Sequence, residues 1–147
     1  MMAEFRKLSG DFYASPQVTP QEISEAAAMG IALVVNNRPD GEAPDQPPGG
    51  DIEAATRAVG MDYLAIPIGG SGFSEPQVEA LQQALAAAQG PVLAFCRSGT
   101  RSTLLWSLAR SRSGEDPEAI AEAAAGAGYD VSPVRPAMDM FAAQARG

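Results

Sequence analysis

Residues 92–102 read VLAFCRSGTRS, an apolar run followed by Cys96 and a short polar loop that ends at Ser102. The apolar run, with Pro91 before it, is typical of a buried strand in a parallel sheet, and a helix is predicted over residues 102–111. Gly99 lets the loop curl tightly, because glycine tolerates a positive φ. Ligands of α/β sheets bind at the carboxyl ends of strands, so residues 96–102, here called the Cys96 loop, are the first candidate for a functional site.

The flanking segments alternate between short β-like runs and amphipathic helices. Thr19 and Ser74 each open a capping-box pattern at the start of a predicted helix, and Asp51 is predicted to cap the helix between them. This alternation predicts one α/β domain over residues 1–147, with a mostly parallel sheet flanked by helices on both faces. The predicted strands are an edge hairpin or strand pair in residues 5–15 and runs at 31–35, 63–68 and 91–95; the predicted helices are 19–30, 51–60, 74–90, 102–111, one from 116 and 136–145.

Composition and charge exclude several classes of function. The 147 residues are 46% hydrophobic and 19% charged, as in a globular domain. A net charge of −8 argues against a nucleic-acid partner, because binding to phosphate backbones needs a basic face. No apolar run could span a bilayer, and the first residues lack the apolar core of a secretory signal. A cytoplasmic protein without membrane partners is therefore predicted.

The chain contains no His and only one Cys, Cys96. The first count excludes Ser-His-Asp and Cys-His catalysis and every His-ligated metal site. The second excludes internal disulfides and Cys-x-x-Cys redox chemistry. Ligands for a metal or an organic cofactor are not evident, so neither is predicted.

Within the Cys96 loop, backbone N–H groups and the N-terminus of the following helix form a cradle for an anion. Cys96 is the predicted nucleophile, although a lone Cys after an apolar strand also suits a small buried hydrophobe. Arg101 is predicted to bind an anion or brace the loop, and Arg97 to steer an anionic substrate or point to solvent. The remaining candidates act through backbone N–H groups, namely Ser98, Gly99 and Thr100, or through a hydroxyl that contacts the sulfur or caps the helix, namely Ser102.

Three stretches resemble a known family: residues 5–8 (FRKL), 36–42 (NNRPDGE) and the Cys96 loop. They are similar to the bacterial beta-lactamase-hydrolase-like family of phosphatase-like proteins or sulfur transferases, whose members also occur fused to persulfide dioxygenases. The order of strand, helix, strand, Cys96 and an Arg-Ser pair also follows the dual-specificity phosphatases. The resemblance runs from Phe5 to about Arg135 and implies the protein-tyrosine-phosphatase-like α/β fold of the dual-specificity type.

Three departures from the phosphatase pattern favour sulfur transfer. Four residues separate Cys96 from Arg101, as in rhodanese-type loops, where phosphatases of this fold have five. Phe95 replaces the His that precedes the phosphatase Cys. Residues 69–73 read GGSGF, where a phosphatase carries its general-acid Asp. Sulfur transfer needs no such acid, so the sequence predicts a rhodanese-type sulfurtransferase that carries sulfane sulfur on a Cys96 persulfide. Its predicted partners are small-molecule sulfur donors, thiol acceptors and a persulfide-oxidising enzyme.

Two alternatives remain open. A cysteine-dependent phosphatase would form a phosphocysteine at Cys96. Asp40, at the end of the second strand, would then serve as an acid and Arg38 would help to hold the anion; the Pro-Asp-Gly sequence around Asp40 also suits a plain turn. A module that binds anions without chemistry would use the N–H groups and Arg101 but would have no need of a thiol.

Overall fold

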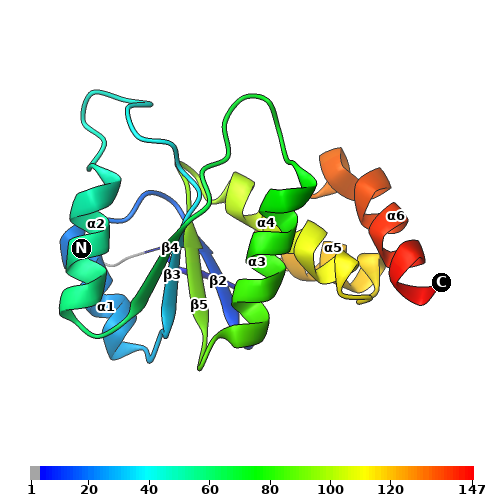
Figure 1. Cartoon of the computed structure of the whole chain (residues 1–147), viewed down its shortest axis with the longest axis horizontal. Helices are drawn as coiled ribbons and strands as arrows, with labels where there is room; N and C mark the ends of the chain where they lie inside the picture. Colours follow the sequence, from blue (N-terminus) through cyan, green and yellow to red (C-terminus); the bar gives the residue numbers. More distant parts are fainter. Residues whose placement is uncertain (1–3) are drawn as a thin grey trace.

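The computed structural model describes residues 4–147, in which five strands form one sheet in the order β1-β2-β5-β3-β4 (Figure 1). β1 pairs with β2 antiparallel, and all other neighbours are parallel. The mostly parallel α/β architecture is therefore confirmed. The strands are β1 (Arg6–Ser9), β2 (Phe12–Ser15), β3 (Leu33–Asn36), β4 (Asp62–Ala65) and β5 (Val92–Phe95).

Both faces of the sheet are buried, as the continuous apolar runs predict. Every residue of β3 and β5 is buried. Val34 and Leu93 pack into one apolar cluster with Ile23 and Ile52, whereas Val35 belongs to a second cluster on the opposite face. Successive side chains of a strand point to opposite faces, so each central strand contributes to two cores.

Helices cover the two faces unequally (Figure 1). Two lie on one side, α1 (Pro20–Ala28) and α2 (Gly49–Ala58). The other side carries α3 (Glu75–Ala87), α4 (Thr100–Arg112), α5 (Pro117–Gly126), the short 3-10 turn Ser132–Val134 and α6 (Arg135–Arg146). The central helix on this side is α4, which packs against α3, α5 and α6. Its Trp106, 3% exposed, stacks on Phe12 with the ring centroids 5.8 Å apart.

Local capping signals placed three helix starts correctly, at Thr19, Ser74 and Asp116, whereas two other starts were predicted incorrectly. The capping boxes at Thr19 and Ser74 are both present. Asp51 was expected to cap α2, but the helix begins at Gly49, whose N–H donates to the Asp40 carboxylate (2.8 Å). The predicted helix at 102–111 begins earlier, at Thr100, with Gly99 as its N-cap. Both errors arise because the helix starts depend on residues outside the predicted helices.

The N-terminal strand pair is present, but only β1 lies at the edge of the sheet. β2 runs parallel to β5 from Phe12 opposite Val92 to Ser15 opposite Phe95. Of the expected edge hairpin, only β1 is an edge strand, whereas β2 lies between β1 and β5. Phe12 and Ala14 of β2 are fully buried. This pairing brings the residues after Ser15 alongside the Cys96 loop, where Gln17 N–H donates to the Arg97 carbonyl (3.3 Å).

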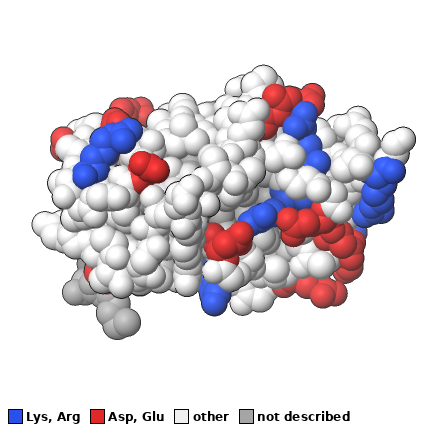
Figure 2. Space-filling model, turned by 60° about the horizontal axis from the view of Figure 1, so that its bottom comes forward, with Lys and Arg blue, Asp and Glu red and all other residues white. Residues whose placement is uncertain are grey.

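The loops that follow β3, β4 and β5 gather at one end of the sheet, at the top of Figure 1. The opposite end is turned forward in Figure 2, where positive and negative side chains lie beside one another. Such pairing is common over the surface, for example between Arg110 and Asp11 (2.7 Å). Within residues 4–147, the helices all lack the length and apolar character that a membrane span would need.

Candidate active site

Cys96 lies directly after β5, at the end of the sheet where the loops meet. Its backbone N–H donates to the Ser15 carbonyl (3.3 Å) and so extends the contact with β2. Its Sγ accepts the Gly99 N–H at 3.1 Å, and the residue is 0% exposed. The sulfur therefore lies against a backbone N–H at the N-terminus of the following helix, which is the positive end of the helix dipole.

The rest of the Cys96 loop is shaped to receive an anion. Gly99 adopts a φ of +92°, a conformation that favours glycine, and its turn leads directly into α4. The backbone N–H groups of Arg97, Ser98, Arg101 and Ser102 make no hydrogen bond to another group of residues 4–147. Unpaired N–H groups beside the positive end of a helix dipole form an anion-binding concavity.

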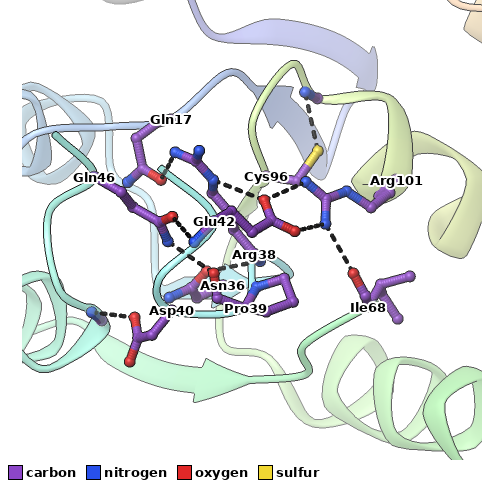
Figure 3. A network of polar contacts seen from close by, with 12 residues as sticks. Gln17, Asn36, Arg38, Pro39, Asp40, Glu42, Gln46, Ile68, Cys96 and Arg101 are labelled. Carbon is purple, nitrogen blue, oxygen red and sulfur yellow. Dashed lines mark hydrogen bonds and ion pairs between the residues drawn. The ribbon is translucent and has the colours of Figure 1, made fainter. Parts of the chain in front are cut away.

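Arg101, in the first turn of α4, directs its guanidinium to the Glu42 carboxylate and the Ile68 carbonyl (Figure 3). Its Nη1 and Nη2 donate to the two Glu42 carboxylate oxygens at 2.7 and 2.9 Å, and Nη1 also donates to the Ile68 carbonyl (2.8 Å). Glu42 raises the pKa of Arg101 most, and the nearby Cys96 raises it further. The Nε–H takes no part in the hydrogen bonds to Glu42 and Ile68, and a guanidinium can donate to two oxygens of an anion along such an edge.

Glu42 joins two arginines, and it was not among the candidate site residues of the sequence. Besides the fork from Arg101, its carboxylate accepts the Arg38 Nε–H at 2.9 Å. The Arg101 hydrogen bonds are the largest cause that lowers the pKa of Glu42, which falls to about 2. Glu42 is therefore ionised at neutral pH and acts as a fixed counter-ion that aligns Arg101.

Replacing Glu42 by Gln is expected to flatten the acid dependence of stability. The pKa of Glu42 lies below its ordinary value of 4.5 in the folded chain, so its contribution to stability is complete above pH 4.5 and is lost as the pH falls towards 2. Urea unfolding at pH 7, 4.5 and 3 should show a smaller loss in Glu42→Gln than in the native chain. Glu53→Gln is the matched control, because Glu53 pairs with Arg57 in an exposed position. An equal loss in all three proteins would contradict this role.

Arg38 lies near the Cys96 loop, but its guanidinium already donates hydrogen bonds to other side chains. Its side chain is 5% exposed and donates to Glu42 and, through Nη1, to Gln17 Oε1 at 3.0 Å. Its backbone N–H donates to Asn36 Oδ1 (2.9 Å). Arg38 thus contacts the site through Glu42, so its place in the structure is beside the anion cradle, one carboxylate removed from Arg101.

Asp40 does not join this cluster. Its carboxylate holds the N-terminus of α2 through Gly49 and points away from Cys96 (Figure 3). It lines a separate open cavity of about 250 Å³ together with Asn36, Tyr63 and the first residues of α2. The position that was considered for an acid is therefore occupied by a helix-capping residue.

The other side chains of the Cys96 loop make hydrogen bonds among themselves or to Asn37, or are exposed. The Ser102 hydroxyl donates to Asn37 Oδ1 (2.8 Å) and not to the sulfur, and Asn37 in turn donates to the Ile66 carbonyl (2.9 Å). Ser98 and Thr100 hydrogen-bond one another through their hydroxyls at 2.9 Å. Arg97 is exposed. Asn37, like Glu42, lies within the quoted 36–42 stretch, but its partner became visible only in the fold.

Comparisons with known proteins agree on the kind of domain. Residues 4–113 match the family model described as beta-lactamase hydrolase-like protein, phosphatase-like domain. The chain is 42% identical over 88 residues to a beta-lactamase hydrolase-like protein of Agrobacterium fabrum, 60% of this chain and 20% of that protein. The chain spans about a fifth of the length of the curated relatives it matches.

Solved structures extend the likeness over nearly the whole chain. A crystal structure of a candidate phosphatase from Neisseria meningitidis is 32% identical, with a TM-score of 0.81, and the match covers 94% of this chain and 98% of the other. TpbA of P. aeruginosa has the same fold, with a TM-score of 0.67 at 20% identity and coverage of 99% and 92%. The expected protein-tyrosine-phosphatase-like fold is confirmed.

These findings contradict the predicted sulfurtransferase activity, since the matching family is described as a phosphatase-like domain and the Neisseria structure as a candidate phosphatase. The prediction counted four residues between Cys96 and Arg101 and took a short loop to mean a small cradle. In the structure α4 already begins at Thr100, and the cradle depends on the direction of the N–H groups and of the Arg101 fork. Loop length alone does not report either direction.

Proposed function

The chain belongs to the beta-lactamase hydrolase-like family of phosphatase-like domains, and from this premise we propose that it is a cysteine-dependent phosphatase acting on phosphate monoesters. The observation that carries the proposal is the Cys96 sulfur beneath the Gly99 N–H (3.1 Å), with unpaired N–H groups and one edge of Arg101 around it. The proposal is supported because phosphoryl transfer needs a nucleophile and donors for the phosphoryl oxygens close together.

The reaction would proceed in two displacements at phosphorus. In the first, the Cys96 thiolate forms an S–P bond while the P–O bond to the leaving group breaks, and that oxygen departs with the electron pair. In the second, water attacks phosphorus, the S–P bond breaks and the thiolate is restored, with inorganic phosphate released. The loop N–H groups and Arg101 stabilise the charge on the phosphoryl oxygens in both steps.

The leaving group would determine the rate more strongly than usual. Glu42 is ionised, because its pKa is about 2, and the Asp40 carboxylate is held on Gly49. Neither carboxyl group is placed to protonate a departing oxygen, and such proton transfer contributes about 10²–10⁴-fold in rate. Acidic leaving groups need no proton, so aryl phosphates with low-pKa phenols are the expected substrates.

The test is hydrolysis of 4-nitrophenyl phosphate and phenyl phosphate at pH 7, with release of inorganic phosphate as the measurement. We expect turnover of the first ester to exceed that of the second by about 100-fold, since no proton donor compensates for the poorer leaving group. Equal rates would contradict the assignment of Glu42 and Asp40 as non-acids. No hydrolysis of either ester, in protein that binds tungstate, would contradict the phosphatase proposal itself.

A further inference from the structure

We propose that Tyr129 is a positioning residue for the anion cradle, holding the Ser98 carbonyl outward so that the neighbouring N–H groups face the substrate. The inference rests on the proposed function, because it assigns a role in binding the phosphoryl group. Tyr129 follows α5 and reaches back to the Cys96 loop, where its hydroxyl donates to the Ser98 carbonyl at 3.1 Å.

The geometry of an anion cradle explains why a carbonyl needs a donor here. If N–H groups are to converge on an anion, the carbonyls of the same loop must point away from it, since an inward carbonyl would repel the anion. Three successive carbonyls of the loop are each held by a donor on the outside. That of Arg97 accepts Gln17 N–H (3.3 Å), that of Ser98 accepts the Tyr129 hydroxyl, and that of Gly99 accepts Thr103 N–H (3.0 Å) and its hydroxyl (2.8 Å).

Three residues supply these donors, and Tyr129 is the one among them that donates through a side chain from outside both the Cys96 loop and α4. The first is a backbone group on the segment after β2, and the third belongs to α4. A hydroxyl can be removed without changing the backbone, so the contribution of Tyr129 can be separated from the fold.

The ring of Tyr129 is fixed firmly enough to act as a brace. It is 7% exposed, and its backbone N–H donates to the Ala124 carbonyl (2.9 Å). The guanidinium of Arg6 lies over the ring, 5.1 Å from its centroid, and donates through Nη1 to the Ala127 carbonyl (3.3 Å). A cation over an aromatic face restricts the ring and adds to its stability.

Gly99 and Tyr129 are also matched in shape. A Cβ atom at Gly99 would overlap the Tyr129 hydroxyl and lie 2.9 Å from its Cζ. Glycine at this position therefore allows both the positive φ of the loop and the close approach of the Tyr129 hydroxyl to the loop backbone. Tyr129 lies beyond residue 113, where the family match ends, so the C-terminal segment completes a site whose nucleophile lies within the match.

Tungstate binding by calorimetry tests the inference without turnover. In Tyr129→Phe the ring and its contact with Arg6 remain, and only the donor to Ser98 is lost. We expect the tungstate Kd to rise about fivefold, the loss that one hydrogen bond produces, and KM for 4-nitrophenyl phosphate to rise more than kcat falls. Tyr63→Phe is the matched control, because its hydroxyl donates to the Gly49 carbonyl (3.4 Å) by the separate cavity.

A raised tungstate Kd in Tyr129→Phe, but not in Tyr63→Phe, would support the positioning role. If the same proteins bound tungstate in this way but hydrolysed no phosphate ester, only the proposed phosphatase function would be contradicted. An unchanged Kd, or an equal rise in both variants, would overturn the positioning role. Thermal unfolding of both variants accompanies the titrations. A Tyr129→Phe chain that failed to fold while Tyr63→Phe folded would also overturn it, since the hydroxyl would then serve the fold.

Discussion

Cys96→Ser is expected to lower kcat for 4-nitrophenyl phosphate by about 10⁴-fold or more, the scale on which enzymes lose rate when the nucleophile is removed. A serine hydroxyl is not ionised at neutral pH, and it needs an adjacent base to become a nucleophile. The chain has no His to serve as that base. The serine oxygen can still accept the Gly99 N–H that Sγ accepts in the native chain, so the cradle should persist.

Phosphate release by Cys96→Ser and the native chain, at equal concentration and pH 7, is the measurement. Tungstate affinity is the control for the integrity of the cradle and should be retained, because the loop N–H groups and Arg101 are unchanged. If Cys96→Ser kept more than about a hundredth of the native rate, the nucleophile would have to lie elsewhere. If the native chain bound tungstate with no turnover of either ester, the anion-binding module would be the better description.

Arg101→Lys should lower kcat/KM by about 10²–10³-fold, although the charge is kept, because removing one transition-state donor costs an enzyme that much. Lysine is a point charge on a flexible stem, whereas the arginine fork makes two parallel hydrogen bonds to a carboxylate and leaves a second edge for phosphoryl oxygens. In this chain Nη1 and Nη2 are held by Glu42 and Ile68, so the other edge is oriented before the substrate arrives.

Arg110→Lys is the matched control for this substitution. Arg110 lies on the same helix, has a similar side-chain exposure (19% against 25%) and pairs with Asp11 and Glu115. Steady-state kinetics on both variants should show a loss only at Arg101. Comparable activity in the two variants would mean that charge alone suffices at position 101, and the oriented fork would lose its assigned role.

Local patterns in the sequence predicted the elements of this fold well. Strand β5 and helix α4, on either side of the Cys96 loop, were predicted from an apolar run and a glycine turn. The capping boxes at Thr19 and Ser74 each involve only four consecutive residues. Such signals work because capping and alternate burial depend on neighbours close in the chain. The predicted start of α2 at Asp51 failed for the converse reason, since its capping carboxylate, Asp40, is nine residues away from Gly49.

The choice of sulfur transfer over phosphoryl transfer was wrong, and the residue that holds Arg101 is distant in the sequence. The sequence favoured sulfur transfer because residues 69–73 lack an acid and the loop is short. Neither feature describes how Arg101 is held, and that depends on Glu42, 59 residues earlier in the chain. The predicted sulfur donors, thiol acceptors and persulfide-oxidising partner are not tested by the fold or the relatives.

The amino-acid sequence alone was sufficient for the α/β class, the strand-loop-helix setting of Cys96 and the candidate role of Arg101, since each depends on residues adjacent in the chain. The tertiary structure decided which groups surround them: Glu42 on Arg101, Asn37 on Ser102 across 65 residues, and Tyr129 on Ser98 across 31. These contacts exist because β3 pairs with β5 and because the chain after α5 returns to the Cys96 loop. Strand order and chain return are set by the packing of the whole core, which no local pattern encodes.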